Sequence, residues 1–437
     1  MSRLFGKAKV SFHHAQTTLC LPLKSGGSVA LADLIKPLTP SCWLNPFIFN
    51  GDAQTVATLV KSMPVKIHYK RRIFEADDPA YLGHFAVDFV APPSKDHDDK
   101  LPPRTTYYSE DEFANIGSDD TKPMLVVLHG LSGGSHEMYL RAFLEPLVAS
   151  EHNPQGGGWE ACVVISRGCS MTTISSTILY NARATWDVRQ TVKWLRKKFP
   201  NRPLFGAGFS LGGNILTNYL GEEGEKCELQ AAVVFSSVWN MEVAAKALQR
   251  TWWHKEVYNR ALGTNMKKLF ERHVDQISKI PGINVDKVRN ITYLFEFDRY
   301  VQGPTWGYPS EGAYYRDASS IDAMLGIRIP LLAIHAEDDP VCCSEVLPVQ
   351  EVQVTPYVVL CSTTLGGHLG WFENGGGRWF VKPSTSFLDK MYKDVQLDKI
   401  SRDELGPLEG YVKRDKRAPL RPVFDPVRRK LHLPVDQ

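Results

Sequence analysis

From Met124 onward, short apolar runs alternate with segments whose apolar residues recur at helical spacing. The runs include MLVVLHG, ACVVISRG, PLFGAGFS and AAVVFSSV, and the segments between them include HEMYLRAFLEPLVAS, ARATWDVRQTVKWLRKKF and GNILTNYLG. Uninterrupted apolar runs of this length are typical of strands buried on both faces. Strands that alternate with helices pair in parallel and carry helices on both faces of the sheet. The sequence therefore predicts an α/β fold with a mostly parallel central sheet.

The alternation breaks near Trp239 and resumes with IPLLAIHAEDDP and PYVVLCSTTLGGH. The intervening residues are aromatic-rich and helical in pattern, which predicts a helical cap inserted into the core. Alternating apolar positions predict two earlier strands in VKIHYKRRIFEA and GHFAVDFVAPP, and the charged, proline-rich stretch after them is expected to be a surface loop. The predicted organisation is an N-terminal arm with helices (1–75), the first part of the core (76–239), the cap (240–326), the second part of the core (327–400) and a basic C-terminal extension (401–437).

The stretch LFGAGFSLGGN carries the strongest chemical signal in the chain. Gly208 and Gly212 flank Ser210 in the pattern G-x-S-x-G, after an apolar strand and before a helix. That context is typical of a nucleophile elbow, a sharp turn that exposes the serine above the sheet. Small flanking residues let the helix approach the strand while the serine adopts a strained backbone conformation. We therefore expect Ser210 to be a catalytic nucleophile.

A serine hydroxyl needs a base to take its proton, and in this architecture the acid and the histidine follow the serine along the chain. The strand LLAIHAEDDP ends in Glu337, Asp338 and Asp339. Asp339 is favoured over Asp338 because it lies farthest past the strand end, next to a proline. His368 follows the last strand in a glycine-rich loop and is the expected base. His335 lies within a strand and is expected to pack or hydrogen-bond there.

The oxyanion of an acyl-transfer intermediate needs backbone donors. One is expected from the residue after the nucleophile, Leu211, and the other from the loop after the first buried strand. In that loop, HGLSGG, the amide of Leu131 is the candidate donor, and Gly130 lets the backbone approach. His129 is expected to support the loop rather than act as a second base.

Metal and cofactor sites are not indicated. Six residues separate His129 from His136, which is no standard ligand spacing on one helix, and neither Glu137 nor Cys162 completes a recognisable set. The eight cysteines include no C-x-x-C pair, so reduced thiols are expected. The 51 basic residues nearly balance the 48 acidic ones, which gives no argument for a nucleic-acid partner.

The chain also resembles a group of α/β-hydrolases that contains the bacterial YheT-type hydrolases, the animal abhydrolase-domain proteins 1, 2 and 3, and the yeast medium-chain fatty acid ethyl ester synthase/esterases. The resemblance covers about residues 40–395. It rests on HGLSGGSHEMYLRA (129–142), ISRGCSMT (165–172), NARATWDVRQ (181–190), GFSLGGNILTNYLGEEG (208–224), FEFDRYVQGPTWGYPSEGAYYRDASS (295–320), HAEDDPV (335–341) and GGHLGWFE (366–373). The stretch NGDAQT (50–55) looks like a divergent form of a family G-H-L-Q-T element, from which Asp52 and Ala53 depart.

The resemblance implies an α/β-hydrolase fold with Ser210, Asp339 and His368 as nucleophile, acid and base. It also implies a substrate class, namely medium-chain acyl esters, acyl-CoA thioesters or acylglycerols, with water or a short alcohol as acyl acceptor. No histidine is followed five positions later by aspartate, which argues against a separate H-x4-D acyltransferase centre. The alternatives are a monoacylglycerol or lipid hydrolase, a dedicated enzyme of a secondary-metabolite pathway and, least favoured, a binding scaffold on a hydrolase fold.

The expected location is cytoplasmic, because no signal-peptide-like start and no run of about 20 apolar residues is present. The basic extension leaves peripheral contact with a lipid droplet or membrane surface open. A set of aromatic residues in or beside the cap is expected, taken together, to line a slot for the acyl chain: Trp239, Trp252, Trp253, Phe295, Phe297 and Trp306. The alternative, favoured for any single one of them, is that they form the cap's own small core.

Overall fold

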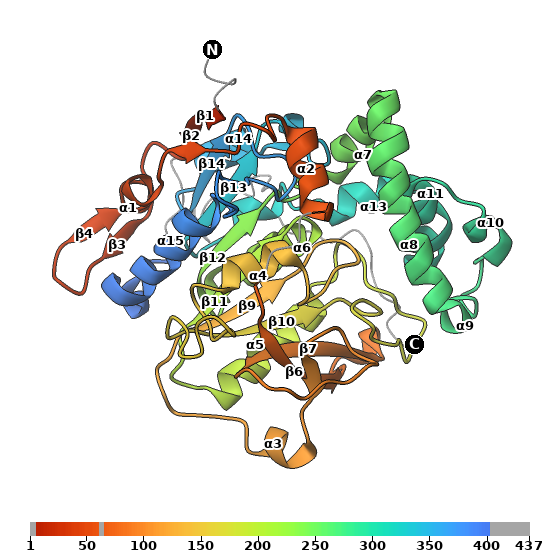
Figure 1. Ribbon diagram of the computed structural model, residues 1–437, viewed down its shortest axis with the longest axis horizontal. Helices are drawn as coiled ribbons and strands as arrows, with labels where there is room; N and C mark the ends of the chain where they lie inside the picture. The colour runs from red at the N-terminus through yellow and green to blue at the C-terminus, as the bar shows by residue number, and fades with distance from the viewer. Residues whose placement is uncertain (1–5, 61–64, 403–437) are drawn as a thin grey trace, which may run out of the picture.

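The computed structural model describes residues 6–60 and 65–402 of the chain. Within them, one ten-stranded sheet runs in the order β2-β14-β13-β12-β11-β9-β10-β7-β6-β8 (Figure 1). Its strands are β2 (Val10–His13), β6 (His68–Glu75), β7 (His84–Ala91), β8 (Thr105–Tyr107), β9 (Met124–Leu128), β10 (Glu160–Ile165), β11 (Leu204–Phe209), β12 (Leu229–Phe235), β13 (Leu331–Ala336) and β14 (Val358–Thr363). Two small antiparallel pairs accompany it, β1 (Lys7–Ala8) with β5 (Cys42–Trp43) and β3 (Cys20–Pro22) with β4 (Ser28–Ala30).

The middle of the sheet is parallel, as the sequence predicts. Strands β10, β9, β11, β12, β13 and β14 pair in parallel, whereas β2 and β7 pair antiparallel at either side of this block. The register sets Gly208 beside Leu128 and Phe209 beside Phe235. The carboxyl ends of these strands therefore meet at one edge of the sheet, where parallel sheets form their ligand sites.

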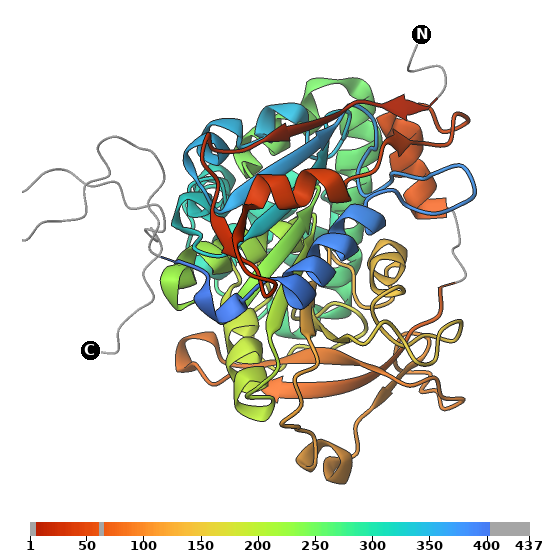
Figure 2. The ribbon, with the colours of Figure 1, turned by 90° about the vertical axis from the view of Figure 1, so that its left-hand side faces the viewer.

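Helices cover the sheet in two layers. On one side α15 (Val381–Asp394) contacts β12 and α4 (Met138–Leu144), and α1 (Leu31–Leu38) contacts α15; Figure 2 shows α1 and α15 in front of the sheet. Helix α6 (Leu211–Glu223) contacts β9, β11 and β12, and α5 (Trp186–Lys198) contacts α6 and β10. Helix α14 (Val349–Val354) contacts β14 and β2 near the sheet edge.

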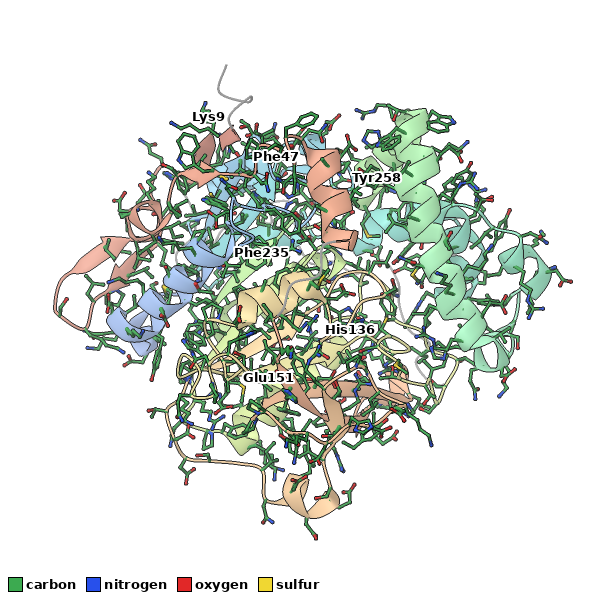
Figure 3. The ribbon with its side chains drawn as sticks, viewed as in Figure 1. Lys9, Phe47, His136, Glu151, Phe235 and Tyr258 are labelled. Atoms are coloured by element: carbon green, nitrogen blue, oxygen red, sulfur yellow. The ribbon has the colours of Figure 1, made fainter. Side chains whose placement is uncertain are left out.

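An aromatic cluster anchors the strands that lead into the site. Phe209 stacks on Phe235 with ring centroids 4.7 Å apart, and Phe143 from α4 packs against both rings. Phe380, which precedes α15, contacts the same two rings, and Figure 3 shows Phe235 within the body of the molecule. Each such pair contributes roughly 0.5–1.5 kcal/mol beyond its buried area. The last residue of β11 is thereby held from the side opposite to α6.

The N-terminal segment contributes to the sheet as well as packing around it. Strands β2 and β6 both come from the first 75 residues, and α2 (Gly51–Val60) lies near the carboxyl edge of the sheet (Figure 1). The stretch expected to be a surface loop holds β8 and the short helix α3 (Glu110–Ala114). A capping box explains this helix, because the Ser109 and Glu112 side chains accept each other's backbone N–H groups.

Residues 240–326, which we call the cap, fold as a set of helices at one end of the sheet (Figure 1). They comprise α7 (Met241–Arg250), a π-helical turn (His254–Asn259), α8 (Arg260–Arg272), α9 (Val274–Ile277), α10 (Val285–Arg289), α11 (Leu294–Phe297), a second π-helical turn (Asp298–Gln302), α12 (Gly303–Trp306) and α13 (Glu311–Ala318). The chain leaves the sheet after β12 and returns in β13, so the cap lies on the carboxyl side of the strands. The basic extension predicted over 401–437 falls outside the described residues beyond Arg402.

Candidate active site

Ser210 occupies the turn between β11 and α6 in a strained conformation. Its φ of 53° lies in the left-handed region, and its N–H donates to the Phe235 carbonyl at 2.9 Å. A Cβ added at Gly212 would lie 2.5 Å from the carbonyl oxygens of Leu128 and His129, and one at Gly208 would lie 2.7 Å from the Gly212 carbonyl oxygen. Both contacts are with backbone, which cannot give way. The two glycines are therefore required for the close approach of α6 to the strands.

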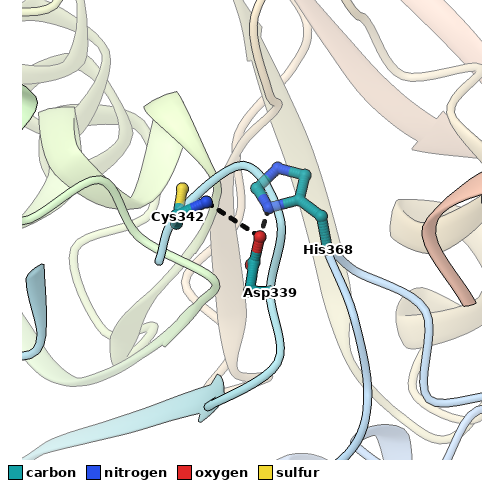
Figure 4. Close-up of side chains that lie close together, drawn as sticks. All are labelled: Asp339, Cys342 and His368. Atoms are coloured by element: carbon teal, nitrogen blue, oxygen red, sulfur yellow. Dashed lines mark hydrogen bonds and ion pairs between the residues drawn. The ribbon is translucent and has the colours of Figure 1, made fainter. Parts of the chain in front are cut away.

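The structure brings the three predicted catalytic side chains into one hydrogen-bonded chain. Ser210 Oγ lies 2.9 Å from His368 Nε2, and His368 Nδ1 lies 2.8 Å from Asp339 Oδ2. Asp339 Oδ1 accepts the N–H groups of Val341 and Cys342, each at 2.8 Å. Figure 4 shows the contacts of Asp339 with Cys342 and His368. Burial alone would raise the pKa of Asp339, but its charge interaction and hydrogen bond with His368 outweigh burial and lower the pKa. Asp339 is thus held as an anion against the ring.

The two neighbouring carboxylates point elsewhere. Asp338 Oδ1 accepts the Gly367 N–H at 2.9 Å, and Glu337 Oε1 accepts the Ser362 hydroxyl at 2.9 Å. Burial raises the pKa of Asp338 to about 6, with the Asp339 charge adding to the rise and the Gly367 N–H opposing it. Asp338 therefore braces the loop that carries the histidine, and the contact with the ring belongs to Asp339.

The expected oxyanion donors face the same space as Ser210. Leu131, Leu211, Ser210 and His368 line one cavity. On either side of Leu131 the amides are occupied, because Gly130 N–H donates to Tyr139 Oη at 2.9 Å and Ser132 N–H donates to Tyr180 Oη at 3.0 Å. Among the described residues no acceptor is recorded for the amides of Leu131 and Leu211, which leaves both N–H groups for a ligand.

Two further histidines near the site are locked in structural hydrogen bonds. His129 Nδ1 donates to the Gly130 carbonyl at 2.7 Å, Nε2 accepts the Ser166 N–H at 3.1 Å, and burial lowers the pKa of His129 to about 4. His335 Nε2 lies 2.8 Å from the Cys342 carbonyl, and burial lowers its pKa as well. Burial therefore favours the neutral form of both rings, and their hydrogen bonds hold the two loops that flank Ser210.

The donor atoms of Asp339, Cys342 and His368 lie within 4.8 Å of one another, close enough to share a metal ion (Figure 4). Two of the three already serve the hydrogen-bonded chain with Ser210. Burial raises the pKa of the Cys342 thiol well above its usual value, so the thiolate that a metal needs is disfavoured. The chemistry of the group thus fits a proton-transfer chain rather than a metal centre.

Sequence reasoning missed the role of α2. Thr55 Oγ1 accepts the His368 N–H at 2.8 Å, and Gln54 Oε1 accepts the Phe372 N–H at 2.8 Å. A Cβ on Gly367 would lie 2.3 Å from the Gly51 carbonyl oxygen, so α2 and the histidine loop are in direct contact. The available signal was the NGDAQT stretch, whose Gln54 and Thr55 match the family element.

Asp52 connects this helix to the cap. Asp52 Oδ1 accepts the Tyr258 hydroxyl at 2.6 Å and the Trp253 indole N–H at 3.0 Å. Figure 3 shows Tyr258 in the region between α2 and the cap helices. One helix therefore contacts both the histidine loop and the cap.

Two cavities meet at Ser210. They share Leu131, Ser210, Leu262 and His368. The first is mainly apolar, and its walls include a group of aliphatic and sulfur-containing side chains from the cap: Met241, Ala244, Ala245, Leu248, Leu262, Met266 and Leu294. The second, which we call the polar cavity, has a more polar lining than the first and is lined in part by the exposed face of α8.

The aromatic residues expected to line the acyl slot do not line the apolar cavity. Trp239 and Phe297 are fully buried elsewhere, and Trp306 packs against Trp186 with ring centroids 5.2 Å apart. Trp252 is 74% exposed on the surface. The expectation was wrong because the direction of a cap side chain depends on how the helices pack, which composition does not encode.

Residues 123–348 match the model of the alpha/beta hydrolase fold family. A monoacylglycerol lipase of Saccharomyces cerevisiae is 36% identical over 304 residues, which cover 69% of this chain and 66% of the relative. The medium-chain fatty acid ethyl ester synthase/esterase 2 of the same yeast is 29% identical, with 79% and 85% covered. Mouse phospholipase ABHD3 is 29% identical, with 66% of each covered. Among the described residues no helix is long and apolar enough to span a bilayer.

Proposed function

The chain belongs to the alpha/beta hydrolase fold family, and on that basis we propose that it is a serine esterase or acyltransferase of medium-chain acyl esters. The observation that carries the proposal is the continuous chain from Ser210 Oγ through His368 to Asp339 at the mouth of an apolar cavity. The curated relatives that it matches are named as a lipase, an ester synthase/esterase and a phospholipase. Their names favour lipid esters as the substrate class.

The geometry supports a two-step reaction. His368 Nε2 takes the proton of Ser210 as Oγ attacks the acyl carbonyl carbon, and the carbonyl oxygen becomes the oxyanion. The amides of Leu131 and Leu211 would donate to that oxyanion, each contributing roughly 3–4 kcal/mol in the transition state. His368 then protonates the leaving oxygen or sulfur, and the C–O or C–S bond breaks to give the acyl enzyme. Asp339 stays ionised throughout and stabilises the imidazolium.

The second step returns the serine. A water molecule or a short alcohol loses a proton to His368 and attacks the acyl carbonyl, and Ser210 leaves with that proton. Hydrolysis of an acylglycerol and synthesis of an ethyl ester differ only in this acceptor. We propose that both ester hydrolysis and transfer from acyl-CoA use this one centre.

A fluorophosphonate probe tests the serine-hydrolase proposal directly. The probe forms a covalent bond only with a serine whose proton has a nearby acceptor. We expect one probe per chain, attached at Ser210, and loss of p-nitrophenyl octanoate hydrolysis in proportion to labelling. A folded protein that takes up no probe would favour the binding-scaffold alternative.

The apolar cavity is expected to set a preference for medium acyl chains. Each buried methylene contributes about 0.8 kcal/mol, which is about fourfold in kcat/KM. The series from p-nitrophenyl acetate to octanoate should therefore rise steeply. Ala244 lies buried in the cavity wall on α7, and Ala244→Leu would fill the slot. This variant should lose octanoate activity while it keeps acetate activity.

The matched control is Gln249→Leu, which adds the same side chain on the exposed face of α7. It should leave the whole series unchanged. A wild-type series without a slope, or an Ala244→Leu variant that loses acetate and octanoate equally, would contradict a chain-binding role for this cavity.

A further inference from the structure

Helix α8 lies between the two cavities and, apart from Leu262, lines each with different residues. Leu262 and Met266 face the apolar cavity, whereas Asn265, Lys268 and Arg272 line the polar one. Positions three and four apart lie on one helix face, so the last three residues form a polar strip along α8. The strip begins beside Leu262, which borders both cavities. The polar strip therefore lies next to a wall residue that the two cavities share, as they share Ser210.

Arg272 differs from the other arginines of the cap. Each of the other five pairs with a carboxylate: Arg250 with Glu345, Arg260 with Glu256, Arg289 with Glu271, Arg299 with Glu311 and Arg316 with Glu242. For Arg272 and Lys268 no carboxylate partner is recorded within the described part of the chain. Two cations four residues apart on one helix repel each other and slightly destabilise it. No intramolecular partner in the described chain compensates that repulsion.

The polar cavity carries an excess of positive charge. Its lining includes one carboxylate, that of Glu137, against the two cations. Burial raises the pKa of Glu137, opposed by Arg141 and Arg378, and its Oε1 lies toward Gly133, where a Cβ would be 3.0 Å away. Glu137 thus lies against the loop that carries Leu131. Among the residues that line the polar cavity, Lys268 and Arg272 are therefore the charged groups that can meet a ligand.

We propose that this cavity binds a phosphate group on the leaving part of the substrate, with Lys268 and Arg272 as its ligands. The inference rests on the proposed function, because the leaving group is defined by attack of Ser210 on the acyl carbon. A planar guanidinium binds phosphate oxygens in a bidentate manner, and an ammonium adds a point charge. The phosphate itself does not react: the acyl C–O or C–S bond breaks and the leaving atom takes its proton from His368.

Two leaving groups carry this chemistry, a glycerol phosphate and coenzyme A. The test compares Lys268→Gln/Arg272→Gln with wild type on octanoyl glycerol 3-phosphate, octanoyl-CoA and neutral monooctanoylglycerol. For the phosphate-bearing substrates we expect kcat/KM to fall by about tenfold or more, since hydrogen bonds to charged groups are lost. Monooctanoylglycerol should be hydrolysed at the wild-type rate. A loss confined to one of the two phosphate substrates identifies which leaving group the cavity takes.

The control is Lys246→Gln/Arg250→Gln, which removes two exposed cations of the cap that line neither cavity. It should not change the preference for phosphate. Equal losses on charged and neutral substrates in the Lys268/Arg272 variant, or no loss on either phosphate substrate, would overturn the proposal.

A binding measurement distinguishes failure of the phosphate site from failure of the proposed function. In a Ser210→Ala background, calorimetry with octanoyl glycerol 3-phosphate and octanoyl-CoA measures affinity without turnover. The Kd of at least one should rise about tenfold or more when Lys268 and Arg272 are also changed to glutamine. If wild type turns over no ester but this shift is seen, the proposed function fails and the phosphate site stands. If esters are hydrolysed but neither Kd shifts, the phosphate site alone fails.

Discussion

Replacement of Ser210 by alanine is expected to lower kcat for p-nitrophenyl octanoate by about 10⁶-fold, because the nucleophile of a hydrogen-bonded triad is removed. The Oγ of Ser210 has one recorded protein partner, His368 Nε2 at 2.9 Å. Its loss should therefore leave the fold intact. Steady-state rates on the purified variant measure the effect, and thermal unfolding monitors the fold.

A variant that keeps more than about a tenth of the wild-type rate would exclude Ser210 as the nucleophile, since no other group could replace it at that level. The His368 ring would still be held by Asp339, and the backbone N–H of His368 would still donate to Thr55 Oγ1. A loss of activity that coincides with a lower melting temperature would point to the strained turn rather than to the chemistry.

Asp339→Asn is expected to lower kcat by about 10⁴-fold, because an amide donor facing His368 Nδ1 favours the wrong tautomer of the ring. Asp338→Asn should leave kcat near the wild-type value. Its Oδ1 can still accept the Gly367 N–H, which is the contact that Asp338 makes with the histidine loop. If Asp338→Asn proved the more damaging change, the assignment of the acid would be wrong.

Asp338 also makes the stability of the folded chain depend on pH. The pKa of Asp338 is raised to about 6 in the folded chain from its ordinary value of 3.8, so folding favours its protonated form. The contribution of this group to the free energy of unfolding therefore falls as pH rises from about 4 to 6 and stays low above that. Asp338→Asn removes this contribution, so the variant should gain stability relative to wild type over that range. Chemical denaturation of both proteins at pH 4, 5, 6 and 7 measures the difference.

Local signals in the sequence were sufficient for the parallel sheet and for the order of the site residues. The elbow could be predicted because Gly208 and Gly212 flank Ser210 between an apolar strand and a helix, a local pattern, although the backbone that Gly212 approaches belongs to β9 and the residue after it. Asp339 could be chosen over Asp338 because it lies farther past the end of the strand, next to Pro340. The elbow and the acid could be predicted because each lies at the end of a strand, and the strands of a parallel sheet end at the same edge.

The parts that could not be predicted depend on contacts between distant segments. Thr55 lies 313 positions before His368, and the NGDAQT stretch singles out Thr55 without indicating that its hydroxyl accepts the His368 amide. The residues that line the apolar cavity could not be predicted for a related reason. Ala244 and Met266 line this cavity, whereas Trp252 faces solvent. Helical periodicity shows that a face exists, but the packing of one cap helix on another decides which face meets the cavity.

The close packing around Ser210 has a consequence for how such a chain can diversify. Added atoms at Gly208 and Gly212 would collide with backbone, so a single mutation there disrupts the fold before any new activity can be selected. Ala244 and Lys268, by contrast, border open space. A lineage that changes its substrate can therefore do so in small, viable steps along the cap, with the reactive centre inherited unaltered.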